Sequence, residues 1–145
     1  MKIKIICVGK LKEKYLVDAC EEYIKRLNIY CKLYIIELPE MQTLNAEAEN
    51  ILKYISGYSI ALCVEGESVE STAFADKIDK LGINGISEVS FIIGSSDGLS
   101  DIIKTSANYK LSMSKLTFPH QLARVMLLEQ IYRVFQINNN GKYHK

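Results

Sequence analysis

The sequence predicts one α/β domain, in which a mostly parallel β-sheet carries helices on both faces. Three observations predict this fold class. Short runs rich in β-branched residues alternate with segments of helical periodicity along the whole chain. The chain has 145 residues, a usual size for one domain, and its 48% hydrophobic residues are enough to fill one core. No repeat, low-complexity tract or linker interrupts the pattern, so residues 1–145 are treated as a single domain.

The first half of the chain is expected to contain three strands and two helices. Gly9 and Pro39 end the first two strands, because glycine and proline interrupt regular structure. Asn45 is a plausible N-cap for the second helix. The expected strands cover residues 2–8, 33–38 and 59–64, and the expected helices cover residues 12–30 and 45–56.

The second half of the chain repeats the alternation. Ser71 is a candidate cap for the third helix, and Pro119 lies at a favourable first-turn position for the last one. The expected strands cover residues 89–93 and 109–113, and the expected helices cover residues 71–81, 100–106 and 119–137.

The last helix is unusually apolar. Of the 16 residues from Leu122 to Ile137, 11 are apolar, which leaves no wide polar face. Such a helix packs on more than one side, and in a domain of this size the second partner is often another subunit. We therefore expect a homodimer. The alternative is a helix buried deep in its own fold.

The net charge of +1 hides an uneven distribution. Residues 39–101 carry 3 basic against 11 acidic residues, whereas residues 102–145 carry 7 against 1. A basic C-terminal third is able to bind a polyanion through one face, because phosphate attraction depends on the local potential. A solvated surface offset by the acidic middle explains the same numbers, so charge alone leaves both interpretations open.

Several classes of protein are excluded by composition. The first residues hold too short an apolar run for a secretory signal, and no stretch approaches the roughly 20 apolar residues of a membrane helix. We expect a soluble cytoplasmic protein with no membrane partner. The four cysteines occur singly and the two histidines lie far apart, so no metal-ligand spacing is visible. We expect reduced, mostly buried thiols and no metal.

Three loops are candidates for a binding site, since each follows an expected strand. They cover residues 61–67, 91–98 and 111–121. Ligands of open α/β sheets bind at the carboxyl ends of strands, where Gly94 and Gly98 let backbone amides come close to a ligand. Three such ends are able to converge on one pocket. Each loop is equally consistent with a plain connection, in which Asp97 caps a helix and His120 caps one or lies in solvent.

The C-terminal segment 138–145 permits two interpretations. Terminal residues are usually frayed, so disorder is the default. Alternatively, Tyr143 and His144 stack on a base while the flanking lysines contact phosphate, provided that a partner subunit holds the segment.

Five segments together are similar to one known family, in order and at compatible spacing from one end of the chain to the other. They are residues 8–15 (VGKLKEKY), 93–99 (IGSSDGL), 111–120 (LSMSKLTFPH), 129–133 (EQIYR) and 143–145 (YHK). The sequence resembles the RlmH family of SPOUT methyltransferases. The resemblance implies an α/β fold with a C-terminal trefoil knot, an obligate homodimer, S-adenosylmethionine as cofactor, and methylation at N3 of a pseudouridine in 23S ribosomal RNA, on the assembled ribosome.

Matching positions of the family imply a set of site residues. The implied cofactor-binding residues are Leu62, Gly94, Met113, Ser114, Lys115, Leu116, Thr117 and Phe118. Lys115, Tyr143 and Lys145 are the candidate RNA contacts. His144 is our hypothetical base, because the imide nitrogen attacks well only after it loses a proton, and Arg133 is the second catalytic candidate.

Two features depart from the family. Ser95 stands where a second glycine usually follows Gly94, and the segment between Pro39 and Ser59 is short. If position 95 requires a positive φ, serine strains the turn and weakens cofactor binding. The competing hypotheses are a non-catalytic nucleotide-binding α/β module, flavodoxin-like in outline, and an RNA-binding protein that kept the fold and lost catalysis.

Overall fold

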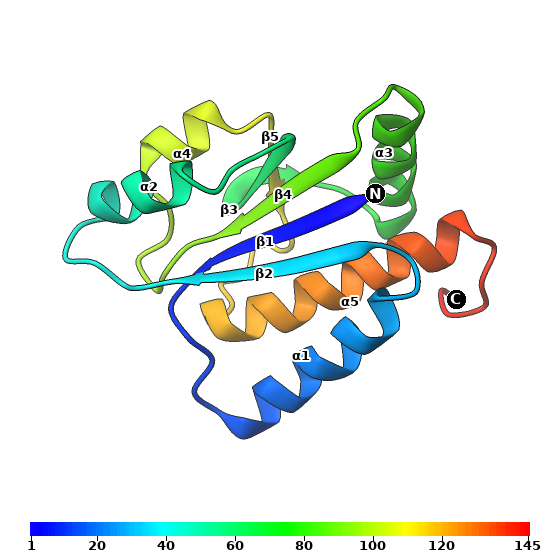
Figure 1. Ribbon diagram of the computed structural model, residues 1–145, viewed down its shortest axis with the longest axis horizontal. Helices are drawn as coiled ribbons and strands as arrows, with labels where there is room; N and C mark the ends of the chain where they lie inside the picture. Colours follow the sequence, from blue (N-terminus) through cyan, green and yellow to red (C-terminus); the bar gives the residue numbers. More distant parts are fainter.

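Five parallel strands form one sheet in the order β2-β1-β4-β3-β5. The computed structural model describes all residues from 1 to 145 (Figure 1). The strands are β1 (Lys2–Val8), β2 (Lys32–Leu38), β3 (Tyr58–Ser68), β4 (Glu88–Ile93) and β5 (Tyr109–Ser112). The helices are α1 (Lys14–Leu27), α2 (Leu44–Leu52), α3 (Ser71–Ile83), α4 (Asp101–Ser106) and α5 (His120–Asn138). The predicted fold class and all ten predicted elements are confirmed.

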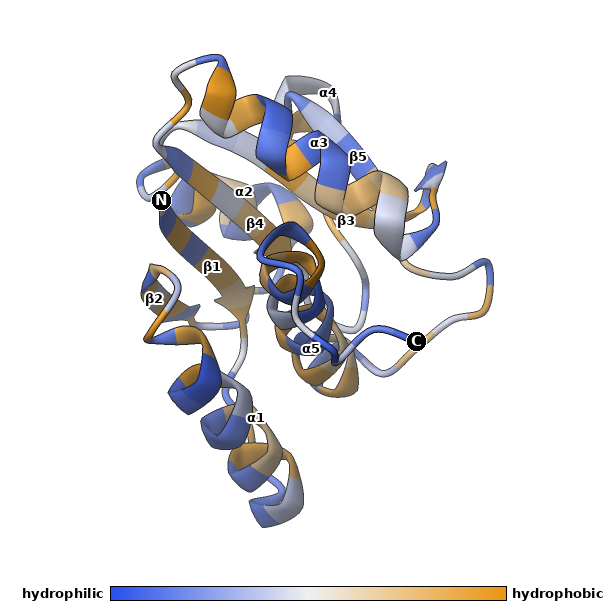
Figure 2. Cartoon of the chain, turned by 90° about the vertical axis from the view of Figure 1, so that its right-hand side faces the viewer, coloured by the Kyte–Doolittle hydropathy of each residue, from blue (hydrophilic) through white to orange (hydrophobic).

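The sheet separates two apolar cores. Helices α1, α3 and α5 cover one face and helices α2 and α4 cover the other (Figure 1). Strand β1 contributes to both cores: Ile3 and Ile5 face the larger one, and Ile6 and Val8 face the smaller one. This division follows from the two-residue repeat of a strand. In Figure 2, helices α1 and α3 alternate between hydrophilic and hydrophobic residues, as expected for helices with one face on the sheet.

The start of helix α2 differs from the prediction. Thr43, not Asn45, is the N-cap, and its hydroxyl accepts a hydrogen bond of 3.1 Å from the amide of Ala46. Threonine and asparagine both cap helices well, so the prediction of Asn45 was wrong by two residues. The helix also ends at Leu52, before the predicted residue 56.

Strand β3 is longer than predicted and contains an irregularity that shapes the site. Leu111 of β5 pairs first with Leu62 and then again with Glu67, so the residues between them leave the ladder. Gly66 permits this excursion, because a Cβ at this position would lie 2.8 Å from the backbone of Leu111. The displaced residues 63–65 therefore stand out from the sheet as a wall.

Helix α5 lies against the sheet between α1 and α3, which accounts for most of its apolar surface. Leu127 and Leu128 are completely buried, while Leu122 and Met126 remain exposed. Burial within its own fold, the alternative considered from the sequence, is therefore the main reason for the apolar composition. The homodimer stays a prediction.

The four cysteines differ in their burial. All four cysteines are unpaired, and Cys7 and Cys20 are buried. Burial raises the pKa of the Cys7 thiol to about 12, which keeps it protonated and unreactive. None of the five helices combines the length and the apolar character that crossing a bilayer requires.

Candidate functional site

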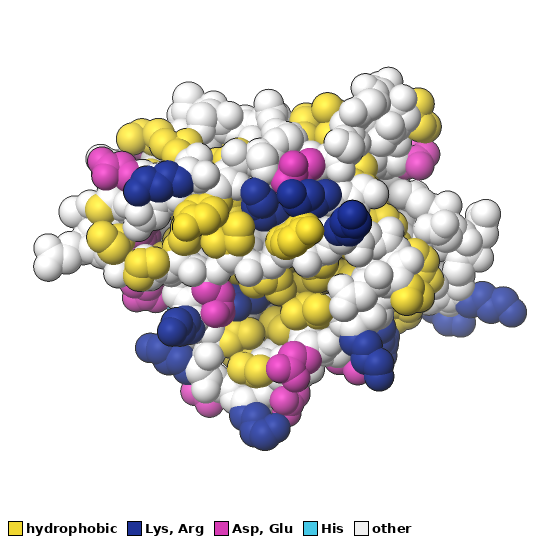
Figure 3. All heavy atoms as spheres, in the orientation of Figure 1, with side chains coloured by type: hydrophobic (Ala, Val, Ile, Leu, Met, Phe, Trp, Pro, Cys, Tyr) yellow, Lys and Arg dark blue, Asp and Glu magenta, His cyan; other side chains and the backbone are white.

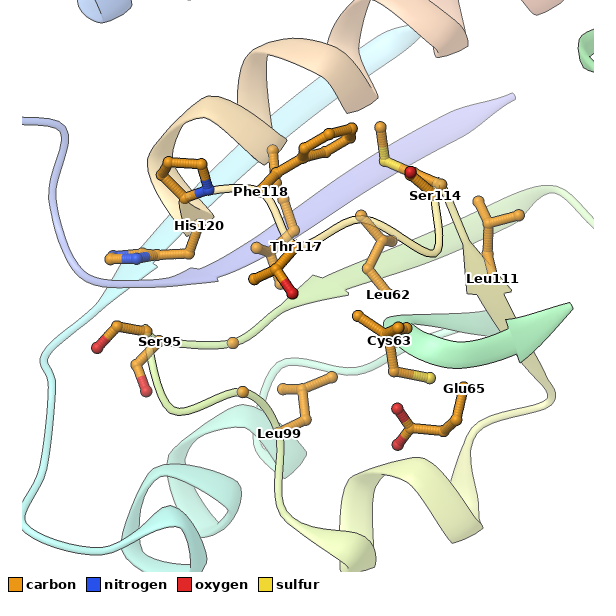
Figure 4. A pocket seen from close by; sticks show the side chains of 18 of the residues that line it. Leu62, Cys63, Glu65, Ser95, Leu99, Leu111, Ser114, Thr117, Phe118 and His120 are labelled. Carbon is orange, nitrogen blue, oxygen red and sulfur yellow. The ribbon is translucent and has the colours of Figure 1, made fainter. Parts of the chain in front are cut away.

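A cavity of about 580 Å³ lies where the displaced segment of β3 meets the loops after β4 and β5 (Figure 4). It is at the carboxyl edge of the sheet, and half of its lining side chains are apolar. Seven of the eight predicted cofactor residues line it: Leu62, Gly94, Met113, Ser114, Leu116, Thr117 and Phe118. Lys115 is not among the lining residues. The structure thus brings together three loops that are separated by about thirty and fifteen residues in the sequence.

The backbone at Gly94 lies very close to the backbone at Gly98. A Cβ on this residue would lie 2.2 Å from the carbonyl oxygen of Gly98, a distance that no side chain tolerates. The backbone on either side of Gly94 therefore folds into a tight turn with no side chain in between. The same turn leaves space above it for a ligand.

Ser95 is not strained, which corrects the expectation from the sequence. Asn140 is the only residue other than glycine with a positive φ. Ser95 is buried, and its hydroxyl donates a 3.1 Å hydrogen bond to Oε1 of Glu47, which is also buried. The other carboxylate oxygen of Glu47 accepts a 3.0 Å bond from the amide of Met41. The serine therefore ties the loop between β4 and α4 to helix α2.

Sequence reasoning missed Glu47. The available signal was the place of this carboxylate in the expected helix, beside Ala48 and near Ile51, which are both buried. A buried acid needs a donor from elsewhere in the chain, and no local pattern says which one.

Removing the Ser95 hydroxyl is expected to destabilise the protein and loosen the loop between β4 and α4. Ser95→Ala leaves the buried Glu47 carboxylate with one donor fewer, at a cost of about 1–3 kcal/mol. Urea unfolding measures this cost, and the exposed neighbour Ser96, which also lines the cavity, provides the control Ser96→Ala. Equal stability of the two variants would show that the Glu47 contact contributes nothing.

Charged groups stand at the mouth of the cavity. Lys104 of α4 and Glu65 of the displaced β3 segment form an ion pair of 2.5 Å. Each partner favours the ionised form of the other, so the pKa of Glu65 is lowered and that of Lys104 is raised. The pair joins two walls of the cavity that are about forty residues apart in sequence.

His120 belongs to the cavity wall (Figure 4), in agreement with the binding interpretation of the loop 111–121, although it was not among the implied cofactor-binding residues. Its Nε2 atom is buried and has no hydrogen-bond partner in the chain, and the nearest carboxylate oxygen, Oε1 of Glu40, is 3.8 Å away. An unpaired buried nitrogen is costly, so its position on the cavity wall makes it a candidate ligand contact.

The C-terminal tail is held against the chain, so the disordered alternative is wrong. Helix α5 ends in a Schellman turn, in which the amide of Gly141 donates to the carbonyl of Gln136 at 2.7 Å and Asn140 adopts a φ of 57°. The turn sends the tail back along α5, where Nη1 of Arg133 lies 3.0 Å from Nδ1 of His144.

Tyr143 makes several contacts within its own chain. Its ring packs edge-on against Tyr132 at 4.8 Å and lies 4.8 Å from the guanidinium carbon of Arg133. Its hydroxyl donates to Glu129 at 2.9 Å. These contacts anchor the tail, and the RNA contact of Tyr143 stays a prediction.

The catalytic candidates lie far from the cavity within one chain. Arg133 is 13 residues beyond His120 on the same helix, which corresponds to about 20 Å along the axis. Figure 1 shows the tail beside the C-terminal end of α5, opposite the end that borders the cavity. One chain therefore does not bring His144 and the predicted cofactor residues together.

The basic C-terminal third is partly neutralised by ion pairs, two of them between distant parts of the chain and one within helix α5. Lys104 pairs with Glu65, Arg124 with Glu37 and Arg133 with Glu129. The remaining four, Lys110, Lys115, Lys142 and Lys145, form no ion pair. In Figure 3, basic side chains on the visible face alternate with acidic ones and with apolar patches. The free positive charge is thus confined to the cavity side and the tail.

Similar proteins were found by sequence and by structure. The family model described as "Predicted SPOUT methyltransferase" matches residues 1–144. Two relatives named "Ribosomal RNA large subunit methyltransferase H", from Clostridium acetobutylicum and Bifidobacterium adolescentis, are 50% and 49% identical to this chain over 159 aligned positions. In both alignments the match covers 100% of each protein.

Solved structures share the fold at low sequence identity. A probable methylase family protein from Haemophilus influenzae has a TM-score of 0.59 at 16% identity, over 99% of this chain and 70% of that one. A probable methyltransferase from Bordetella pertussis has a TM-score of 0.59 at 10% identity, over 92% of this chain and 96% of that one.

The sheet order, the loop-lined cavity at its carboxyl edge and the match to the family model agree with one another. The trefoil knot is tested by none of them and stays a prediction. With a match to 144 of its 145 residues, the chain belongs to the SPOUT methyltransferase family.

Proposed function

We propose that this protein transfers a methyl group from S-adenosylmethionine to N3 of a pseudouridine in 23S ribosomal RNA. Membership of the SPOUT family and the full-length relatives named as ribosomal RNA large subunit methyltransferases support the reaction class and the RNA substrate. The observation that carries the proposal is the cavity itself. Three loops, named as cofactor-binding from the sequence, enclose one space.

The cavity fits the cofactor. Its volume of about 580 Å³ lies within the usual range for small-molecule sites. Apolar residues such as Leu62, Leu116 and Phe118 offer a surface for the adenine ring, and the side-chain-free turn at Gly94 exposes backbone groups for polar contacts. When bound, S-adenosylmethionine supplies a methyl group that is already activated by a sulfonium. The protein's task is therefore to align two reactants and to favour the imidate form of the base.

A homodimer completes the proposed site. His144 and Arg133 are too far from the cavity of their own chain to meet a ligand there, so we assign them to the cavity of a second copy. Leu122 and Met126 on α5, together with Leu116 at the cavity, are exposed apolar side chains on the same end of the chain. Their burial would contribute to holding two copies together.

RNA contacts are proposed for the unpaired lysines. Lys115 follows the cavity-lining residue Ser114, and Lys145 follows His144, so both flank the groups assigned to the reaction. Their charge favours phosphate through local attraction. A ribosomal RNA substrate supports a cytoplasmic location. The family resemblance favours the assembled ribosome as the form of the substrate.

Calorimetric titration with S-adenosylmethionine and with S-adenosylhomocysteine tests the cofactor, while light scattering reports the mass. We expect binding in the micromolar range by a dimer, followed by transfer of labelled methyl groups to ribosomes that lack this modification. Binding without methyl transfer to ribosomes or their subunits would contradict the proposed reaction. Absence of binding would favour the non-catalytic RNA-binding alternative. A strained Ser95 was the only sign of that alternative in the sequence, and Ser95 has no positive φ.

A further inference from the structure

The contact between Arg133 and His144 fixes the position of a proton. A guanidinium has five N–H donors and no acceptor, and it stays charged in proteins. Nη1 of Arg133 lies 3.0 Å from Nδ1 of His144, so Nδ1 is the acceptor and carries no proton. A neutral imidazole with an unprotonated Nδ1 carries its proton on Nε2.

Contacts with Glu129 and Tyr143 hold the Arg133 side chain in place. Glu129 accepts hydrogen bonds from its Nε, at 3.1 Å, and from its Nη2. The ring of Tyr143 covers the guanidinium at 4.8 Å. The Arg133 side chain is 23% exposed and that of Glu129 is 13% exposed, so solvent competes weakly for these bonds. The two N–H groups of Nη1 are not used by Glu129, and Nη1 lies 3.0 Å from Nδ1 of His144.

Tyr143 keeps the tail in the position that this contact requires. Its hydroxyl donates to Oε1 of Glu129 at 2.9 Å and lies 3.3 Å from the hydroxyl of Tyr23 on α1. Burial, followed by these two hydrogen bonds, raises the pKa of Tyr143 well above its ordinary value. The hydroxyl stays protonated and serves as a donor, so Glu129 connects the arginine and the tyrosine that flank His144.

We propose that His144 acts on the RNA base as a hydrogen-bond donor through Nε2–H and not as the proton acceptor. Arg133, Glu129 and Tyr143 are positioning residues that fix this tautomer. This role rests on the proposed function for its substrate, but the tautomer is a property of the protein alone. It replaces the hypothesis that His144 is the base, since an Nδ1 occupied by a guanidinium and a protonated Nε2 leave no free lone pair on the ring.

The proposed step balances without a base on the protein. The imide N–H of the pseudouridine loses its proton to solvent water, and the negative charge spreads over the two neighbouring carbonyl oxygens. Nε2–H of His144 donates to one of these oxygens and stabilises the anion. The nitrogen then attacks the methyl carbon, so that the carbon–nitrogen bond forms while the carbon–sulfur bond breaks and the sulfonium becomes a neutral thioether. The fixed charge of Arg133 behind the ring polarises Nε2–H further.

Nitrogen-15 NMR of the histidine rings tests the tautomer directly. The chain has two histidines, so in the His120→Gln variant the only histidine signals are those of His144. At about pH 8, above the ordinary titration range of histidine, we expect an unprotonated Nδ1 and a protonated Nε2. A free neutral histidine already favours Nε2–H, so in Arg133→Met the tautomer ratio should fall to that intrinsic level, whereas Arg133→Lys, which keeps a donor, should retain part of the excess. A protonated Nδ1 in the parent chain would overturn the proposal.

The role in catalysis is tested by comparing His144→Gln with His144→Ala at saturating cofactor. The Gln side-chain amide donates a hydrogen bond but has no basic nitrogen. We expect methyl transfer by His144→Gln to be on the order of 10-fold faster than by His144→Ala. Equal rates would overturn the donor role. Failure of the proposed function is a different result, because the parent protein would then transfer no methyl group while the NMR signals still report the tautomer.

Discussion

Gly94→Ala is expected to lower the affinity for S-adenosylmethionine by on the order of 100-fold, because the added methyl group displaces the turn that supports the ligand. Its Cβ would lie 2.2 Å from the oxygen and 2.5 Å from the carbon of the Gly98 carbonyl. Both atoms belong to the backbone, so the turn cannot relax by rotating a side chain. Calorimetric titration with S-adenosylhomocysteine measures the loss without turnover.

Gly85→Ala is the matched control for this variant. Gly85 has a φ of +90° and nothing within 4 Å of an added Cβ, and it lies outside the cavity. Alanine there should lower thermal stability through backbone strain and leave cofactor affinity unchanged. A similar loss of affinity in both variants would mean that general destabilisation, and not the turn at Gly94, is responsible.

His144→Ala is expected to slow methyl transfer by on the order of 100-fold or more while cofactor binding stays nearly intact. The separation of the two effects follows from geometry, since His144 contacts Arg133 in the tail and is not among the residues that line the cavity. Single-turnover transfer to ribosomes and calorimetry on the same preparation measure the two quantities. An unchanged rate would remove His144 from the mechanism.

The two variants together test whether the site is shared between subunits. At a cofactor concentration that just saturates the parent site, Gly94→Ala and His144→Ala should each retain only on the order of 1% of the parent activity. After subunit exchange, half of the dimers contain one chain of each kind, and one of their two sites combines an intact cavity with an intact tail, so about a quarter of the parent activity should return. Sites that are complete within one chain would give no recovery, because every chain would carry one defect.

The sequence determined the order of elements, the fold class and the loops of the site. These features depend on local information: the β-branched run at residues 2–8, the helical spacing after residue 12, and Gly94 immediately after a buried strand. A strand and its following loop keep their identity wherever the chain folds. For this reason seven of the eight residues assigned from the resemblance were found around one cavity.

Tertiary structure decided which distant residues became partners. Ser95 was interpreted as a source of strain, yet it bonds to Glu47, 48 residues earlier in the chain. Arg124 is almost completely buried, and it pairs with Glu37, which lies 87 residues away. No periodicity predicts such pairs, because a buried polar group needs a complementary group in space and not at any fixed distance in sequence.

The same need for partners that are distant in sequence explains why the surroundings of α5 and of the tail were not predicted. The apolar composition of α5 was compatible with a second subunit and with deep burial, and only its position between α1 and α3 showed how much its own chain covers. The letters of Tyr143 and His144 suggested contact with RNA. In the folded chain, Glu129 accepts hydrogen bonds from Arg133 and from the Tyr143 hydroxyl, and Arg133 contacts His144. These contacts between α5 and the tail set the orientation of both tail residues.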